Sequence, residues 1–473
     1  MGTDAGTFDL LIRGGEVVTA EGVRHCDVGI ASGRVVALEN ELEANSATRL
    51  VDADGKIVVP GAIDVHTHFG NRVGPHSTAD DYASGTLSAA FGGITTIVNY
   101  CIQEPGESLV DAAERDRRLA EAVAMIDFSL HVIVVDPPTD LPTELAALAA
   151  AGCPSVKLFT AVQPFMLSDA AILDVMAAAS QAGVVVNVHA EDGSLIDHLT
   201  RDLIDAGHVG IASLPRSRPV LAEELAIRKL VGYASQLGTS LYVVHVSTAN
   251  GLAAIVEARA SGVEVYAETR PAYLFLDESR YAESETIGRF VACWPPLRSA
   301  GDQDAMWAGL GDGRVQTYAT DHTSWMAAEK LDPTLSFDAV PGGFANVETS
   351  IGMLYNEGVL GGRLSLERFV RATSTNPAKI FGLYPQKGQI ALGADADLVV
   401  IDPAADRTII RERMHSRSDV EPYAGYRAQA WPVVTVARGE VVVEDDRIEG
   451  EPGRGRYVAR SVDGAARREA LVP

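Results

Sequence analysis

The stretch "GAIDVHTHFG" (residues 61–70) places two histidines one residue apart, directly after the apolar run "KIVVP" (56–60). On a β-strand, the side chains of residues i and i+2 point to the same face. His66 and His68 therefore share a face if this stretch is a strand. They either hold one metal ion together or are two unrelated polar residues on the solvated side of a strand. The sequence on both sides of this stretch bears on that choice.

The middle of the chain alternates Val- and Ile-rich runs with Ala-rich helical patterns. Near-continuous apolar strands alternating with helices are typical of parallel strands buried on both faces. Eight such strands over ~260 residues predict a (β/α)8 TIM barrel of the α/β class. The predicted strands are "IVVPGAIDVH" (57–66), "GITTIVNYC" (93–101), "DFSLHVIVVD" (127–136), "SVKLFTA" (155–161), "GVVVNVHA" (183–190), "SLYVVHVS" (240–247), "GVEVYAET" (262–269) and "VQTYATDH" (315–322).

Both ends of the chain have a different pattern, made of short β-like runs separated by turns, over residues 8–58 and 386–448. Two sets of short strands from opposite ends predict a small β-sandwich domain built from both termini, with a structural role. The polar C-terminal tail, rich in Gly and Arg, is expected to fray or to wrap a neighbouring subunit. The expected parts are the first half of the sandwich, the barrel, the second half of the sandwich and the tail, at residues 1–58, 59–380, 381–450 and 451–473.

Composition restricts the partners and the location of the protein. Acidic residues outnumber Lys and Arg by 64 to 39, giving a formal net charge of −25, and a field of this sign repels nucleic-acid phosphates. No apolar stretch approaches the ~18 residues that span a bilayer. The N-terminal "MGTDAGTFDL" lacks the regions of a signal peptide. The four cysteines show no C-x-x-C spacing, which favours reduced thiols in a cytoplasmic protein.

Polar side chains stand at or near the ends of five predicted strands. In a (β/α)8 barrel, active-site residues lie at the C-terminal ends of the strands. Each residue alone has an ordinary explanation: His189 could be a core histidine, and Asp321 could cap a helix. Together at one barrel mouth they would form an uncompensated polar cluster unless something binds them. The set comprises His66, His68, Lys157, His189, His245 and Asp321.

Imidazole and carboxylate groups together suit a divalent transition metal, with Zn²⁺ the leading candidate and Mn, Fe, Ni or Co as alternatives. Six candidate ligands exceed the needs of one catalytic ion, whereas two ions with a bridging hydroxide use them all. Lys157 is unusual in this set because a protonated lysine has no lone pair. It could pair with Asp321, snorkel out of the barrel wall, or react with CO₂ to give a carbamate that bridges two ions. Its position inside the apolar run "SVKLF" argues against snorkelling.

At these residues the sequence resembles the hydantoinase and dihydropyrimidinase branch of the amidohydrolase superfamily. The resemblance covers nearly the whole chain and implies a barrel with a β-sandwich, a binuclear metal centre and a homotetramer or, less commonly, a homodimer. That family hydrolyses small cyclic amides such as hydantoins and dihydropyrimidines, and sister branches act on allantoin and dihydroorotate. The matching segments, in order, are "GAIDVHTHFG", "VVVNVHAEDG", "LYVVHVSTANG", "AETRPAYLFLDES", "PPLRS", "ATDH", "RFVRATSTNPAKIFGLYPQKGQIALGADADLVVIDP", "HSRSDVEPYAGY" and "VARGEVVV".

The resemblance also implies a role for each polar residue. His66 and His68, with Asp321, would hold the more buried ion. His189 and His245 would hold the more exposed one, and Lys157, as N6-carboxylysine, would bridge the two. The metal-bridging hydroxide would attack the ring carbonyl, while Asp321 would act as the catalytic base and then as the acid. The ring would open to an N-carbamoyl acid or a related acid.

Three positions that contact the substrate in that family carry different residues here. Val162, in "KLFTAV", replaces a tyrosine whose hydroxyl binds the oxyanion. Trp294 replaces a serine before "PPLR", and Gly342, in "VPGGFANVE", replaces a common asparagine. Losing an oxyanion donor costs ~3–4 kcal/mol of transition-state stabilisation, so we expect hydantoin and dihydrouracil to be poor substrates. The residues that could substitute as donors are Thr160, His322 and Thr323.

Two loops are expected to overhang the pocket, "GNRVGPHSTADDY" (70–82) and "QPFMLSD" (163–169). Phe165, Met166 and Trp325 are candidates for apolar substrate contact, with core packing as the alternative.

Other functions compete with hydantoinase-like hydrolysis. One keeps the hydrolase class but changes the bond to another amide, lactam, imide, ureide or lactone, as in an allantoinase-like or specialised catabolic or biosynthetic enzyme. A second is a non-catalytic assembly protein related to dihydropyrimidinase, which predicts missing ligands, whereas none is missing here. A mononuclear deaminase is a third, disfavoured by Lys157, which deaminases do not need.

Overall fold

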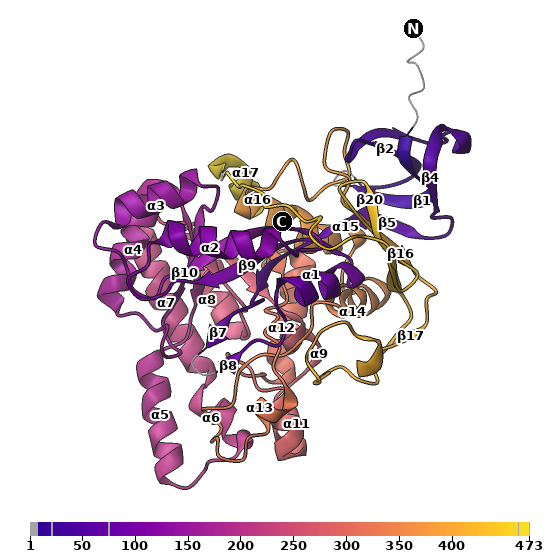
Figure 1. Ribbon diagram of the computed structural model, residues 1–473. Helices are drawn as coiled ribbons and strands as arrows, with labels where there is room; N and C mark the ends of the chain where they lie inside the picture. Colours follow the sequence, from indigo (N-terminus) through magenta and orange to yellow (C-terminus); the bar gives the residue numbers. More distant parts are fainter. Residues whose placement is uncertain (1–7, 20–21, 74–75, 462, 473) are drawn as a thin grey trace.

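The computed structural model describes residues 8–19, 22–73, 76–461 and 463–472. Its centre is a sheet of eight parallel strands that pair in chain order (Figure 1). A parallel bridge between Thr67 and His322 joins the first strand to the segment after the last, and the His68 amide donates to the His322 carbonyl at 3.0 Å. The predicted barrel is confirmed. The strands are β6 (Ala62–Thr67), β9 (Ile94–Ile102), β10 (Asp127–Ile133), β11 (Ser155–Phe159), β12 (Val185–His189), β13 (Leu241–Val243), β14 (Val265–Thr269) and β15 (Thr317–Tyr318).

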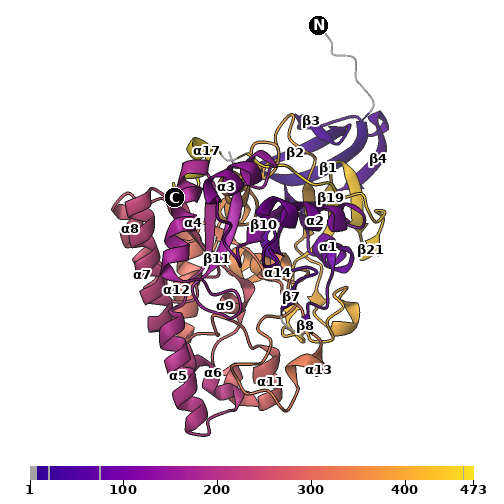
Figure 2. The ribbon, with the colours of Figure 1, turned by 60° about the vertical axis from the view of Figure 1, so that its left-hand side comes forward.

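Helices follow the strands and surround the barrel (Figure 2). Several begin at a serine whose hydroxyl accepts a backbone amide, as Ser168 does from Ala171, which satisfies a donor that the first turn leaves free. Short helices from the connections after β12, β14 and β15 lie with α5 at one end of the molecule in both ribbon views. The principal outer helices are α1 (Tyr82–Phe91), α2 (Leu109–Glu121), α3 (Leu141–Ala150), α4 (Asp169–Ala182), α5 (Gly193–Asp205), α7 (Val220–Leu237), α8 (Ala249–Ala260) and α12 (Ala300–Asp312). The short helices are α6 (Leu214–Ser217), α11 (Glu285–Phe290) and α13 (Ala327–Lys330).

A second sheet of nine strands lies beside the barrel and combines both chain ends. Its two halves meet where β5 pairs antiparallel with β16. The sheet encloses a core of its own, to which Leu10 and Val28 contribute from one end of the chain and Leu398 and Val436 from the other. The small β domain built from both termini is therefore confirmed. Its strands are β1 (Phe8–Thr19), β2 (Gly22–Ala31), β3 (Arg34–Glu39), β4 (Ala47–Asp52), β5 (Ile57–Pro60), β16 (Leu398–Asp402), β19 (Trp431–Ala437), β20 (Glu440–Glu444) and β21 (Arg447–Ile448).

The run expected to be one strand, 57–66, is two strands in different sheets. β5 belongs to the second sheet and β6 to the barrel, and Gly61 lies between them. A Cβ at Gly61 would come within 2.1 Å of the Thr95 Oγ1, so only glycine fits where the chain crosses from one sheet to the other. The expected boundary between residues 58 and 59 falls inside β5.

Residues 456–460 of the C-terminal tail pack on the barrel of the same chain, where the expectation was that the tail frays or wraps a neighbouring subunit. The Phe128 amide donates to the Arg456 carbonyl at 3.0 Å, and the Val458 amide donates to the Phe128 carbonyl at 2.8 Å. Arg460 is buried and donates to the hydroxyls of Ser129 and Ser155, both at 2.8 Å. The tail thus covers the end of the barrel opposite the C-terminal ends of the strands.

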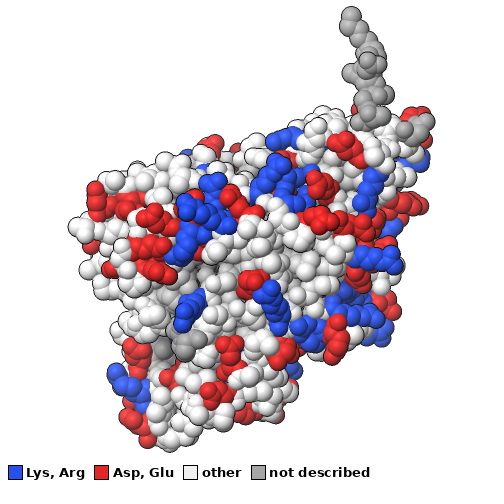
Figure 3. All heavy atoms as spheres, viewed as in Figure 1, with Lys and Arg blue, Asp and Glu red and all other residues white. Residues whose placement is uncertain are grey.

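On the face seen in Figure 3, acidic and basic side chains are interspersed. On α2, Arg117 and Arg118 pair with Glu121 and Glu114 of the same helix, both at 2.9 Å. Within the residues described, no helix is long and apolar enough to cross a membrane.

Candidate active site

One cavity at the C-terminal ends of the barrel strands collects all six polar residues singled out in the sequence. It has a volume of about 160 Å³. Four of the six side chains lie on or directly after β6, β11 and β12, and two follow β13 and β15. The structure therefore brings together His66, His68, Lys157, His189, His245 and Asp321.

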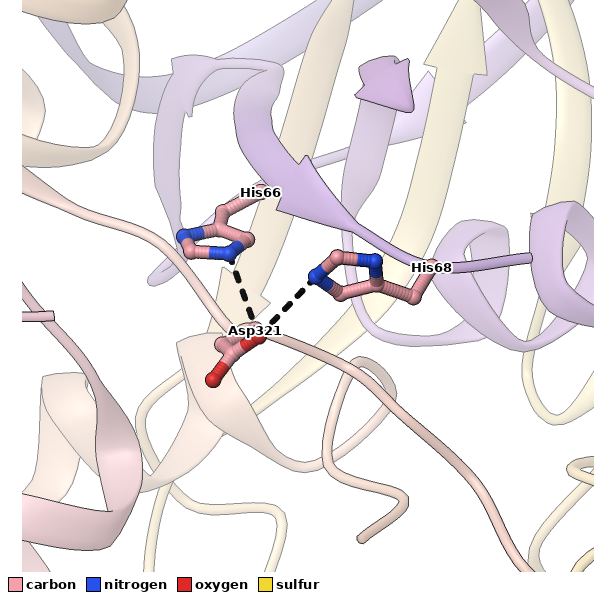
Figure 4. A group of neighbouring side chains, drawn as sticks. All are labelled: His66, His68 and Asp321. Atoms are coloured by element: carbon pink, nitrogen blue, oxygen red, sulfur yellow. Dashed lines mark ion pairs between the residues drawn. The ribbon is translucent and has the colours of Figure 1, made fainter. Parts of the chain in front are cut away.

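His66, His68 and Asp321 form the tightest group (Figure 4). The Asp321 Oδ1 lies 3.1 Å from the His66 Nε2 and 3.3 Å from the His68 Nε2. Burial raises the pKa of Asp321, but His66 and Arg270 outweigh burial and hold this pKa well below its ordinary value. An ionised carboxylate between two imidazole nitrogens is a donor set that can hold a divalent metal ion.

His189 and His245 form a second pair across the cavity. The His189 Nδ1 faces the His245 Nε2 at 3.1 Å, and the His245 Nδ1 is buried with no hydrogen-bond partner in the described part of the chain. Burial lowers the pKa of both rings, which favours neutral imidazole, the form that binds metals. These donors also fit a metal ion.

Lys157 is 1% exposed, which excludes the snorkelling alternative. Its Nζ lies 4.9 Å from the centre of the Tyr100 ring and 5.1 Å from that of Phe159. Among the described residues it has no ion pair with Asp321. Burial lowers the pKa of the amine to about 7, so a large fraction is uncharged near neutral pH. The uncharged amine is the form that can react with CO₂.

Comparison with known proteins agrees with this arrangement. Residues 57–442 match the model of the amidohydrolase family. The chain belongs to this family. It is 38% identical to D-hydantoinase from Geobacillus stearothermophilus, with 96% of this chain and 97% of that one covered. The crystal structure of dihydropyrimidinase from Brevibacillus agri superposes with a TM-score of 0.93 at 37% identity, covering 96% and 98%. L-hydantoinase from Arthrobacter aurescens superposes with a TM-score of 0.88 at 31% identity, covering 96% and 100%. These matches place the chain in the hydantoinase branch.

In this amidohydrolase, Glu268 at the end of β14 orients the His66 imidazole and binds the backbone of His245. Its Oε1 lies 2.6 Å from the His66 Nδ1 and accepts the His245 amide at 2.9 Å, while the Tyr242 hydroxyl donates to its Oε2 at 2.8 Å. A carboxylate behind a ligating histidine fixes the ring and raises its basicity. Sequence reasoning missed Glu268, although it lies near the end of a predicted strand, as the histidines do.

Two further groups orient the rings of His189 and His68. The Glu191 Oε2 lies 2.8 Å from the His189 Nε2, and Arg218 pairs with the same carboxylate. The Asn71 Oδ1 lies 3.0 Å from the His68 Nδ1. Sequence reasoning missed Glu191 and Asn71. They lie two and three residues from their histidine partners, and this spacing does not predict a contact unless the fold is known.

Arg270 was also missed, although it directly follows the predicted strand 262–269. It is 2% exposed, lines the cavity and pairs through its Nη1 with the Asp321 Oδ2.

Apolar residues form another part of the lining of the amidohydrolase cavity. Val162, Phe165, Trp294, Trp325 and Gly342 all line it. Val162 has a φ of +77°, a conformation that β-branched residues rarely adopt. A Cβ on Gly342 would lie 2.9 Å from the Trp294 indole, and the Trp325 Nε1 donates to the Gly342 carbonyl at 2.8 Å. The glycine and Trp294 are therefore complementary in shape.

Two of the expected substrate contacts lie outside the cavity lining. Thr160 does not line the cavity, because its hydroxyl donates to the carbonyls of His189 and Glu191 at 2.9 and 2.7 Å. Met166 does not line it either, and its sulfur packs beside Gly193.

His322 is likewise engaged elsewhere: its Nε2 lies 2.9 Å from the Asp80 Oδ2, and its Nδ1 accepts the backbone amides of Asn346 and Val347. Of the three suggested substitute donors, only Thr323 lines the cavity.

Proposed function

We propose that this amidohydrolase opens the ring of a small cyclic amide with the help of two divalent cations. The observation that carries the proposal is the convergence of four imidazoles, one carboxylate and one buried lysine on a single cavity. Relatives that match nearly the full chain bear the names D-hydantoinase, D-phenylhydantoinase and dihydropyrimidinase. Those names support hydantoin-like and dihydropyrimidine-like rings as the first substrates to test.

We propose the following metal-binding role for each site residue. His66, His68 and Asp321 hold one cation, and His189 and His245 hold the other. Lys157, as its carbamate, would supply an anionic group to both cations. Zn²⁺ is the first candidate, with Mn, Fe, Ni and Co as alternatives. Cations bound there would polarise an amide carbonyl and lower the pKa of water.

Asp321 would carry the proton during ring opening. Its carboxylate would accept the proton of the attacking water and return it to the ring nitrogen as the C–N bond breaks and a C–O bond forms. The product is an N-carbamoyl acid or a related open-chain acid. Glu268 keeps the His66 ring in place during these steps.

We further propose that the pocket disfavours hydantoin and dihydrouracil themselves. Val162 supplies no hydroxyl for the oxyanion, and Trp294 fills space against Gly342. Phe165 and Trp325 would contact an apolar part of the substrate. Trp294 and Gly342 favour, as a second candidate, the opening of a different amide, lactam, imide or ureide.

A substrate panel tests the proposal. Protein prepared with zinc and bicarbonate is incubated with dihydrouracil, substituted hydantoins, allantoin, cyclic imides and lactams, and ring opening is followed by chromatography. We expect turnover of at least one ring, lost on chelation and restored by zinc. His245→Asn should abolish turnover. His198→Asn, which changes an exposed side chain on α5, should leave turnover unchanged. No turnover of any ring by metal-replete protein would contradict the proposal.

We also propose a homotetramer or homodimer, as the family resemblance implies. The proposed division of the chain is into residues 1–58, 59–380, 381–450 and 451–473, with its first boundary inside β5. Light scattering of the purified chain measures the assembly, and a monomer at micromolar concentration would contradict it. Limited proteolysis tests the division.

A further inference from the structure

Arg270 places a permanently charged group in the wall of the cavity. Its Nη2 donates to the Tyr273 hydroxyl at 2.7 Å and to the Pro295 carbonyl at 3.3 Å. Its Nη1 donates to the Asp321 Oδ2, and its Nε has no hydrogen-bond partner in the described part of the chain. An arginine cannot lose its proton in a protein, and burying its charge is costly without an anion nearby.

Asp321 is the only carboxylate among the described residues that line the cavity, and it is the only ion-pair partner of Arg270 among them. The same carboxylate also faces His66 and His68. If Asp321 holds a cation and moves a proton, its oxygens are no longer free for Arg270. The working site then contains a buried guanidinium without an anion.

We propose that Arg270 binds a carboxylate of the substrate, so that the ring opened by this enzyme carries an acidic substituent. The inference rests on the proposed function and names its substrate class. A guanidinium binds a carboxylate through two parallel hydrogen bonds, which fixes the orientation of the bound ring. A substrate carboxylate replaces Asp321 as the partner of Arg270 and frees the Asp321 Oδ2 for proton transfer. In the metal-loaded site, a neutral ring leaves the Arg270 guanidinium without an anion.

The test uses two probes of the same shape, hydantoin-5-acetate and hydantoin-5-acetamide, which differ in charge. For the metal-loaded enzyme we expect kcat/KM to be about tenfold or more higher for the acetate. Arg270→Met and Arg270→Gln should remove this preference, and Arg270→Lys should retain part of it. Two neutral variants are used so that one that fails to fold leaves the test intact.

Arg289 provides the matched control. It is also a buried arginine, but its guanidinium donates to backbone carbonyls of Asp332 and Leu335 and does not line the cavity. Arg289→Met should lower stability and leave the ratio of the two probes unchanged.

Calorimetric binding of both probes to the Asp321→Asn protein, in which no carboxylate competes for Arg270 and no proton carrier remains, gives a readout that does not depend on turnover. We expect Arg270→Met to weaken binding of the acetate about tenfold or more and to leave binding of the acetamide unchanged. Equal kcat/KM for both probes, with binding to the Asp321→Asn protein unchanged by Arg270→Met, would overturn the role of Arg270 and leave the proposed function standing. If no cyclic amide is opened, the proposed function fails, and the binding experiment still decides whether Arg270 holds a carboxylate.

Discussion

Val162 stands in the cavity wall with a positive φ, at the position where the family resemblance implies an oxyanion-binding tyrosine. Val162→Tyr returns a hydroxyl to that wall. We expect kcat for hydantoin to rise about tenfold or more, because one oxyanion donor is typically worth 10²–10³ in rate. Steady-state kinetics with hydantoin measures the change. Val162→Phe, which has the ring without the hydroxyl, is the control, and equal rates for the two variants would refute this explanation.

Trp294 and Gly342 are coupled by direct contact. Gly342→Asn places a Cβ 2.9 Å from the indole, so we expect it to reduce the free energy of unfolding by about 1–3 kcal/mol. In the Trp294→Ser background the clash is absent, and the same change should cost much less. A double-mutant cycle by urea unfolding measures the coupling, expected to be about 0.5–3 kcal/mol. Strictly additive effects would show that the two sites are independent.

At the scale of the elements, β14 supports the site through Glu268. Glu268→Gln keeps the shape but removes the charge behind the His66 ring, and we expect metal affinity to fall about 10–100-fold. Equilibrium dialysis with zinc, followed by elemental analysis, measures the loss. Glu264, just before β14, pairs with Arg467 instead, so Glu264→Gln should bind zinc as the wild type does. Equal losses in both variants would point to a general structural effect.

The elements also show which features the sequence could predict. Each apolar run contains one barrel strand. The polar residues at or near the ends of those runs lie together at one end of the barrel, because parallel strands in a barrel share a C-terminal face. The division of 57–66 into β5 and β6 could not be read locally, since both segments are apolar and only distant pairing partners separate them. The positions of the Thr160 and Arg270 side chains could not be predicted for a related reason. Whether a side chain bonds a neighbouring strand or enters the cavity depends on contacts far apart in the chain.

At the scale of the whole molecule, a buried ion cluster joins the barrel to the second sheet. Lys387, 1% exposed, lies 2.8 Å from Asp127 at the start of β10 and 2.6 Å from Asp397, which precedes β16. Arg438 lies 2.8 Å from Asp127. Burial raises the pKa of Asp127, but Lys387 and Arg438 outweigh burial and lower this pKa below its ordinary value. This contribution to stability is present above the unfolded-state pKa of about 4 and is lost as the pH falls through the lower folded-state value.

Lys387→Met should therefore lower the free energy of unfolding by about 3–5 kcal/mol at pH 7, because it leaves buried carboxylates unpaired. In the variant those carboxylates take up protons at a higher pH than in the wild type. The difference between the two proteins should thus shrink as the pH falls from 7 towards about 4. Urea unfolding across this range measures it. Lys229→Met, which removes an exposed ion pair with Asp169, should cost less than about 1 kcal/mol, and a similar loss in both variants would contradict the role of the cluster.

The central claim is that side chains from five strand ends hold two cations, with a modified Lys157 between them. Anomalous X-ray diffraction at the zinc edge, from crystals of protein prepared with zinc and bicarbonate, tests it most directly. We predict two anomalous peaks, one beside His66, His68 and Asp321 and one beside His189 and His245, with electron density extending beyond the Lys157 Nζ. No peak, or a single peak beside an unmodified Lys157 at saturating zinc, would contradict the account.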